Sequence, residues 1–304
     1  MIRYWWAACR PRTLPIAMTP VVVGAALAWV ARGGTLNAGV WWLTLLAAVL
    51  IQVATNLHND AADGVRGLDQ PAARIGPPRV TAAGWLSARQ VQQAAHGCFM
   101  LALGLGVGLV AIGGLPILLI GLAALAAGYG YSGGPRPLAA SALGELYVWL
   151  FFGVAAVAGT YYLQTGRVDT GALLAGALLG LLAAAVLAVN NHRDRAGDRI
   201  AGRRTLALRL GSQATCGVYT LLVLGPFLLA PTLHQHGLGP WSWLLPELAL
   251  PWALCLAARF WRTPGGTGLN AVLVATVRLE LYFGLLLALG VVLDHTPRPS
   301  HAPG

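Results

Sequence analysis

The sequence predicts an all-α integral membrane protein, because three features of the chain occur together. Of its 304 residues, 57% are hydrophobic and 10% are charged, whereas a soluble domain has about 25% charged residues. The mean hydropathy is +0.66. Apolar runs long enough to cross a bilayer recur along the whole chain. We therefore expect a single transmembrane domain over residues 1–295 and a disordered tail at 296–304.

Dividing the apolar runs at roughly 20 residues per span predicts about nine transmembrane helices. The first follows the segment RYWWAACRPRTLP, which is too polar for the core of a cleaved signal peptide, so we expect this span to be retained. The second and sixth spans each end in a cluster of polar residues, and the last contains Arg278 and Glu280. The expected spans cover 13–31, 38–57, 89–111, 113–131, 142–163, 170–190, 212–231, 242–261 and 269–293.

The net charge of +10 comes from arginine alone, since the chain contains no lysine. With nine spans, sixteen of the 20 arginines fall on one side of the membrane, together with the N-terminus. The positive-inside rule places that side in the cytoplasm. The basic balance therefore indicates a multi-pass protein of the bacterial cytoplasmic (inner) membrane, in contact with the lipid bilayer, and we predict no nucleic-acid partner.

Half of the ten acidic residues lie in two short strings, NLHNDAADGVRGLD and NNHRDRAGD, each at the end of an expected span. Both strings begin Asn-x-His-x-Asp, and the two beginnings are 134 residues apart. Two similar halves related by a pseudo-axis would bring the strings face to face across one cavity. The strings contribute Asn56, Asp60, Asp63 and Asp69, and then Asn190, Asp194 and Asp198.

Carboxylates three or four residues apart share one face of a helix and repel each other. At a separation of 5–6 Å the repulsion is roughly 3 kcal/mol for an effective dielectric near 20. Protonation or a bound cation must therefore offset the charge, and asparagine and aspartate supply the oxygen ligands that suit Mg²⁺ bound together with phosphate. The alternative, a solvated loop whose acids neutralise nearby arginines, gives no reason for the repetition.

Arginines surround both acidic strings and favour a diphosphate as the ligand. A guanidinium group binds phosphate oxygens through two parallel hydrogen bonds, so carboxylates with arginines describe a site for a metal and a diphosphate. The predicted diphosphate-binding residues are Arg66, Arg74, Arg79, Arg193, Arg199, Arg203 and Arg204.

These motifs resemble those of the UbiA superfamily of intramembrane aromatic prenyltransferases. Further blocks extend the resemblance over most of the chain: RPRTLPIAMTPVVVGAAL, YSGGPRPLAASALGELYVWLFFGVAAVAGTYYLQTG, NNHRDRAGDRIAGRRTLALRLG and LNAVLVATVRLELYFGLLLALG. The resemblance implies a pseudo-repeated bundle of about nine helices around a central cavity with a cytoplasmic cap. It also implies an apolar groove, open to lipid, for the isoprenoid tail. One departure is Arg203, which stands where the family has lysine.

The resemblance implies specific roles for residues of this chain. Mg²⁺ would be held by Asn56, Asp60, Asp63, Asn190, Asp194 and Asp198, of which the four aspartates are the predicted catalytic residues. Asp69, Tyr129, Tyr131 and Arg278 are expected in the cavity near the acceptor. Within the superfamily the chain is similar to the naphthoate branch. That branch transfers a polyprenyl group from polyprenyl diphosphate to 1,4-dihydroxy-2-naphthoate, with loss of diphosphate and CO₂, and gives demethylmenaquinol in menaquinone biosynthesis.

Three alternatives follow from the same residues. An aromatic acceptor such as 4-hydroxybenzoate or homogentisate would use the same metal site. A CDP-alcohol phosphotransferase would share the start Asp-x-x-Asp-Gly but needs two further acids within the next couple of turns, whereas here Asp69 follows at once and the acids of the second string come more than a hundred residues later. A transporter using the acids as cation sites would place polar residues in the middle of broken helices, whereas both strings lie at span ends.

Overall fold

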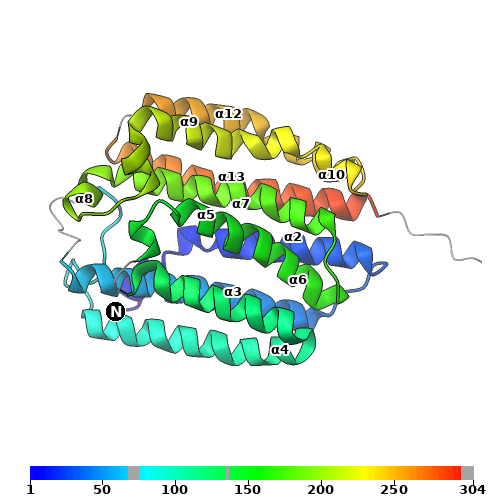
Figure 1. The fold of residues 1–304 in the computed structure, drawn as a ribbon, viewed down its shortest axis with the longest axis horizontal. Coiled ribbons are helices and arrows are strands. Elements are labelled where there is room, and N and C mark those ends of the chain that lie inside the picture. Colours follow the sequence, from blue (N-terminus) through cyan, green and yellow to red (C-terminus); the bar gives the residue numbers. More distant parts are fainter. Residues whose placement is uncertain (68–74, 135–136, 264, 296–304) are drawn as a thin grey trace, which may run out of the picture.

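A computed structural model describes residues 1–67, 75–134, 137–263 and 265–295. Within these ranges every regular element is helical, and the long helices lie side by side along one direction (Figure 1). The α-helices are α1 (Ile2–Cys9), α2 (Pro15–Ala31), α3 (Ala38–Val65), α4 (Ala88–Ser132), α5 (Gly144–Trp149), α6 (Ala156–Thr165), α7 (Thr170–Arg193), α8 (Arg195–Ile200), α9 (Leu206–Leu229), α10 (Thr232–Gln235), α11 (Trp241–Leu244), α12 (Leu250–Arg262) and α13 (Gly268–Leu293). A π-helical stretch, Leu150–Ala155, joins α5 to α6. The predicted tail at 296–304 lies outside the described residues.

Seven segments of the described chain are long and apolar enough to cross a membrane, and the bent pair of α1 and α2 would make an eighth. The predicted number of nine is therefore not confirmed by length and composition. One helix, α4, covers two of the predicted spans. Its 45 residues are interrupted at Gly114, where the backbone is not helical (φ 61°, ψ −149°). The ring centroids of Phe99 and Tyr129 are only 6.1 Å apart, so the chain reverses at this glycine and the two halves of α4 lie antiparallel.

Polar side chains fix where the long helices begin. Asn37 and Asp169 accept hydrogen bonds from backbone N–H groups in the first turns of α3 and α7, at 3.1 and 2.8 Å. At the start of α4, Ser87 and Gln90 form a reciprocal capping box. These bonds satisfy donors that a helix end leaves without partners, which matters most where the chain meets an apolar solvent.

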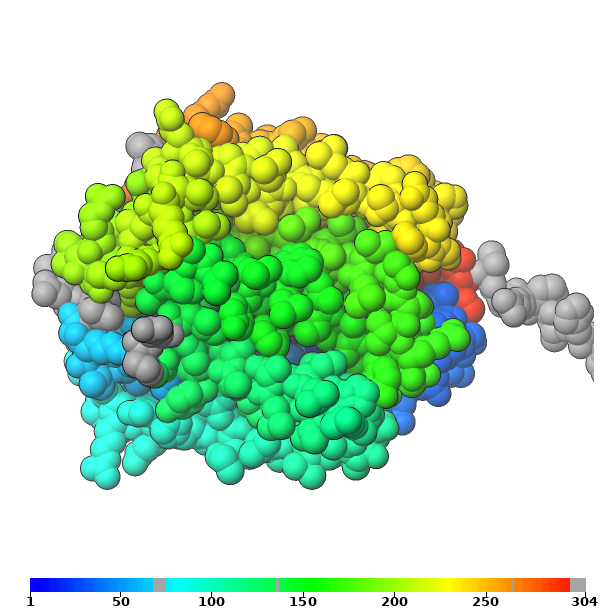
Figure 2. Space-filling view, in the orientation of Figure 1, coloured from blue at the N-terminus to red at the C-terminus, as the bar shows by residue number. Residues whose placement is uncertain are grey.

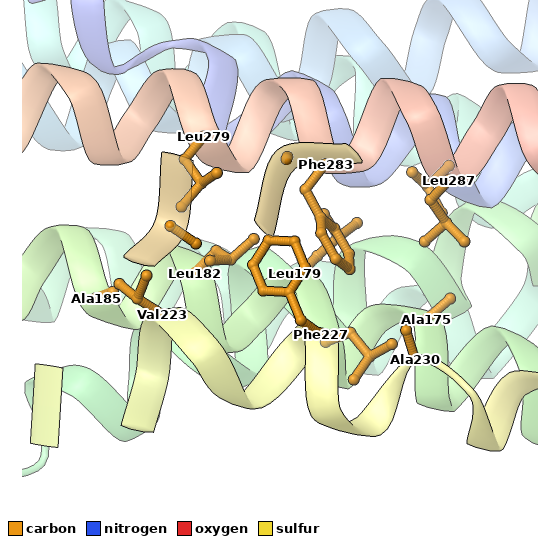
Figure 3. Close-up of a cluster of buried hydrophobic side chains, with 14 of the residues drawn as sticks. Ala175, Leu179, Leu182, Ala185, Val223, Phe227, Ala230, Leu279, Phe283 and Leu287 are labelled. Atoms are coloured by element: carbon orange, nitrogen blue, oxygen red, sulfur yellow. The ribbon is translucent and has the colours of Figure 1, made fainter. Parts of the chain in front are cut away.

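The main hydrophobic core surrounds α7, which contacts α9, α13 and the α5–α6 segment. Leu179 and Leu182 of α7 lie among Val223 and Phe227 of α9 and Phe283 of α13 (Figure 3). All five side chains are buried. The polar C-terminal end of α7 is thereby held in a fixed place relative to the rest of the bundle.

Close backbone contact joins α7 to the π-helical stretch. A Cβ atom on Gly153 would overlap the backbone of Gly176 and Gly180, and one on Gly180 would overlap the carbonyl of Trp149. Small residues allow helices to approach closely in a membrane, where van der Waals packing replaces the hydrophobic effect as the main attraction. This contact positions α5 and α6 beside the central cavity.

Candidate active site

A cavity of about 1040 Å³ lies inside the bundle. Its polar end is formed by the C-terminal ends of α3 and α7 and by α8. Its apolar arm continues between α4 and the α5–α6 segment, with lining residues that include Gly106, Gly121, Phe151 and Gly159. Figure 2 shows a hollow between these segments, in which the blue of the N-terminal part of the chain is visible. The cavity therefore joins a charged end to an apolar arm in a single space.

The two acidic strings meet at the polar end of this cavity. All six side chains expected to bind metal line it, namely Asn56, Asp60, Asp63, Asn190, Asp194 and Asp198. Arg203 joins the strings directly, because its Nη2 lies 2.8 Å from Asp63 Oδ1 and its Nη1 lies 3.2 Å from Asp198 Oδ1. Carboxylates 135 residues apart in the sequence thus share one guanidinium group.

The remaining carboxylates are also held in place. Asp60 accepts hydrogen bonds from the backbone N–H groups of Val80 and Thr81, each at 3.1 Å, which ties the segment after α3 to the end of that helix. Asp194 accepts two hydrogen bonds from the guanidinium of Arg193, from Nε at 2.8 Å and from Nη2 at 2.7 Å. Each aspartate is therefore oriented before any ligand arrives.

The electrostatics of the polar end favour an additional positive charge. Burial raises the pKa of Asp198, in the short helix α8, to about 6; Arg203 opposes this shift, and the charges of Asp194 and Asp63 add to it. As the side chains stand, no three acidic, histidine or cysteine residues among those described are close enough to hold a metal ion. Asp63, Asp194 and Asp198 contact arginines instead, and Asp60 accepts hydrogen bonds from backbone N–H groups, so a metal would take the place of some of these contacts.

Only part of the predicted arginine set lies in this cavity. Arg79, Arg193 and Arg203 line it, and Arg79 also contacts Asp63 at 3.3 Å. Arg66 lines a smaller neighbouring pocket of about 340 Å³ and donates a hydrogen bond to the carbonyl of Gly134 at 3.1 Å.

Two predicted diphosphate-binding residues, Arg199 and Arg204, lie outside both pockets. Both residues are exposed. Arg74 and Asp69 lie outside the described residues.

Two of the residues expected near the acceptor do not line the cavity. Tyr131 lines it, but Tyr129, two positions earlier on the same helix, faces outward and stacks on His58 with ring centroids 4.5 Å apart. Arg278 belongs to the exposed stripe of α13, together with Tyr282 and Leu285. In this structure neither Tyr129 nor Arg278 lines the cavity, since helix geometry turns both side chains away from it.

The sequence alone did not single out Arg10 and Asn59 as site residues. Both line the cavity, and Arg10 Nη2 donates a hydrogen bond to Asn59 Oδ1 at 2.9 Å. Arg10 also has a left-handed backbone (φ 51°, ψ 61°), which is rare for a residue other than glycine and is typical of functional sites. The block RPRTLP that carries the resemblance begins at this arginine, and this was the available signal.

Comparisons with known proteins agree with this architecture. The chain is 33% identical over 297 residues to the 1,4-dihydroxy-2-naphthoate octaprenyltransferase of Escherichia coli, and the match covers 95% of each protein. It is 38% identical to the enzyme of the same name from Mycobacterium tuberculosis, over 93% of this chain and 95% of that protein. The solved structure of a UbiA homologue from Archaeoglobus fulgidus, bound to GPP and Mg²⁺, superposes with a TM-score of 0.66 at 16% identity, over 93% of this chain and 99% of that one.

The fold is that of an all-α membrane protein, and the two relatives identify an enzyme of the prenyltransferase class. Residues 17–292 match the model of the UbiA prenyltransferase family, which leaves out only the two ends of the chain. The chain belongs to the UbiA prenyltransferase family.

Proposed function

We propose that this chain transfers a polyprenyl group from a polyprenyl diphosphate to 1,4-dihydroxy-2-naphthoate, in a Mg²⁺-dependent reaction that releases diphosphate and CO₂. The observation that carries the proposal is the contact of Arg203 with Asp63 and Asp198 at the charged end of an apolar cavity. An amphiphilic diphosphate fits such a space, because its head group and its tail need opposite environments. The names of the Escherichia coli and Mycobacterium tuberculosis relatives support the choice of acceptor.

The residues at the polar end fit Mg²⁺ as the metal. Their donors are carboxylate and amide oxygens, which Mg²⁺ prefers, and no histidine or cysteine among the described residues lines the cavity. Asp60, Asp63, Asp194 and Asp198 would hold the metal, together with Asn56 and Asn190. When bound, Mg²⁺ supplies positive charge to the oxygens of the leaving diphosphate.

The arginines of the cavity complete the binding of the diphosphate. Arg79, Arg193 and Arg203 line the polar end, and their forked donors match phosphate oxygens. They stabilise the negative charge that grows on the diphosphate as its bond to the prenyl carbon breaks. We place Arg66, in the smaller pocket, on the cytoplasmic path of the released diphosphate.

The apolar arm binds the tail and keeps water from the reacting carbon. Its walls come from α4 and the α5–α6 segment and contain Phe151, Gly106 and Gly121. Excluding water protects the allylic cation until the ring carbon of the acceptor attacks it. Tyr131 also lines the cavity, and its ring can stabilise a nearby cation through its π face.

A transfer assay tests the proposal. Membranes containing the chain are supplied with Mg²⁺, a polyprenyl diphosphate and 1,4-dihydroxy-2-naphthoate, with 4-hydroxybenzoate as a competing acceptor. We expect a prenylated, decarboxylated naphthoquinol, an at least 100-fold loss in Asp60→Asn and Asp194→Asn, and loss of activity on chelation of Mg²⁺. Asp169→Asn is the matched control, because Asp169 caps α7 away from the cavity and asparagine caps helices equally well.

Two results would contradict the proposal in different ways. Prenylation of 4-hydroxybenzoate alone would keep the metal site and overturn the acceptor. Activity that persists in both cavity variants would show that the aspartates do not carry the reaction.

A further inference from the structure

Gln52 is a polar side chain in the membrane-spanning part of α3 that the reaction described above does not use. It lies one helical turn before Asn56, lines the same cavity, and is only 8% exposed. An amide at membrane depth is costly unless it forms hydrogen bonds, so its position demands an explanation.

The threonines along this part of the cavity have partners within the protein. The hydroxyls of Thr44, Thr55 and Thr160 each donate to the carbonyl four residues earlier, at 2.7–2.8 Å. The side chain of Gln52 makes no hydrogen bond to any part of the chain that the structure describes, although it lines the cavity. Its carbonyl and its NH₂ group are therefore both available to a ligand.

The position of Gln52 relative to the polar end identifies the kind of ligand. At a rise of 1.5 Å per residue, Gln52 lies about 6 Å along α3 from Asn56 and about 12 Å from Asp60, toward the apolar arm. Residues four apart share a helix face, so the amide lies on the same face of α3 as Asn56, between the site of the diphosphate and the apolar arm. Of the two reactants, the prenyl tail has no hydrogen-bonding atom, and the diphosphate belongs with the arginines. The aromatic acceptor is the reactant that carries oxygens to this depth.

We propose that Gln52 binds a ring hydroxyl of the aromatic acceptor and so selects hydroxylated rings. The inference rests on the proposed function, since it assumes an aromatic acceptor in this cavity. The amide carbonyl accepts a hydrogen bond from the hydroxyl and thereby orients the ring toward the prenyl carbon. A site built to hydrogen-bond a hydroxyl rejects ligands that lack it, because its own polar group is then left unpaired.

Equilibrium binding to the purified full-length protein, by calorimetry, tests this role apart from catalysis. The probes are 1-hydroxy-2-naphthoate, 4-hydroxy-2-naphthoate and 2-naphthoate, which differ only in the hydroxyl. We expect the wild-type protein to bind one hydroxylated ring about 10-fold or more tightly than 2-naphthoate. In Gln52→Met, which keeps the length of the side chain but removes the amide, the preference should vanish while the affinity for 2-naphthoate stays the same.

A second variant and a control distinguish loss of the amide from a general change in the cavity wall. Gln52→Asn, which retains a shorter amide, should restore part of the preference, and it replaces the methionine variant if that one does not fold. Thr55 lies on the same wall, but its hydroxyl already donates a hydrogen bond to the carbonyl of Ile51. The Thr55→Val variant should therefore show the same preference for hydroxylated rings as the wild type. An unchanged hydroxyl preference in Gln52→Met, or an equal loss for all three probes, would overturn the inference. Absence of prenyl transfer in the wild type would contradict the proposed function instead, while the binding preference still decides the role of Gln52.

Discussion

Arg203 holds one carboxylate from each acidic string, and the side chain of its neighbour Arg204 is exposed. The contrast arises because a backbone hydrogen bond from Arg204 N–H to the carbonyl of Ala140 (2.8 Å) fixes the segment after α8. With the backbone fixed, adjacent side chains point in different directions. Removing the charge at each position in turn therefore distinguishes an arginine that acts in the cavity from one that only directs the orientation of the chain in the membrane.

We expect Arg203→Met to lower the rate of prenyl transfer about 100-fold, because Asp63 and Asp198 lose the cation between them and the diphosphate loses a donor. Arg204→Met should retain most of the activity. The measurement is the transfer rate in membranes at matched protein amounts. Equal losses in the two variants would mean that general surface charge, rather than the Arg203 contact, supports the reaction.

The sequence identified the acidic residues because ionised side chains are rare and costly in an apolar chain, so their repetition carries information. It did not identify which arginines face the cavity, because arginine is also the topology signal of this protein. Tyr129 and Tyr131 could not be separated either, since a short aromatic run shows no periodicity. Arg10 reaches the site through a left-handed backbone and a contact with Asn59, 49 positions away, which only the folded chain reveals.

At the scale of elements, α4 shapes the apolar arm of the cavity through alternate glycines. Gly106 lines the cavity, whereas Gly108, two positions later, lies on the exposed face, and a Cβ atom at either position would meet no other atom within 4 Å. A larger side chain is thus accommodated at both positions, but only at Gly106 does it enter the cavity.

Gly106→Leu should therefore shorten the prenyl chain that the enzyme accepts. We expect transfer from a C10 diphosphate to change little and transfer from a C40 diphosphate to fall at least 10-fold, because the added side chain occupies space that only the longer tail needs. Gly108→Leu should leave the ratio of the two rates unchanged. Equal losses for both donors in Gly106→Leu would show that the tail takes another path.

The contact between α7 and the π-helical stretch makes a separate prediction about stability. Gly180→Ala should lower the stability of the protein by about 1–3 kcal/mol, because the new methyl group overlaps the backbone of Trp149. Gly104→Ala, on the exposed face of α4, should stabilise the protein slightly or leave it unchanged. Thermal unfolding in detergent measures both. A lower unfolding temperature for Gly104→Ala than for Gly180→Ala would contradict the packing argument.

Most of the spans were predictable from the sequence at this scale, because bilayer thickness fixes helix length, although the predicted number of nine is not confirmed. The reversal inside α4 was predictable from the length of its apolar run, which exceeds one crossing. Its position at Gly114 depends on a backbone conformation that glycine tolerates and that Pro116 then reinforces. The π-helical stretch had no sequence signal, because it results from the fit against the glycines of α7.

For the whole molecule, the folded chain places the two acidic strings and most of the arginines at the same end of the bundle. That end contains α8 and the C-terminal ends of α3 and α7, and the opposite end contains the turn between α6 and α7 (Figure 1). By the positive-inside rule we expect the polar end of the cavity to face the cytoplasm. Diphosphate, which cannot cross an apolar layer, would be released on the side where the arginines lie.

Cysteine labelling tests this orientation. In a chain whose four cysteines are replaced by alanine, we introduce Ile200→Cys, at the 89% exposed end of α8, and Val168→Cys, 45% exposed in the turn between α6 and α7. A maleimide that does not cross membranes should label position 168 in intact spheroplasts and position 200 only after permeabilisation. Prenyl transfer by the cysteine-free chain is the control for folding. The reverse pattern would mean that arginine does not direct insertion of this chain, and would place the release of diphosphate outside the cell.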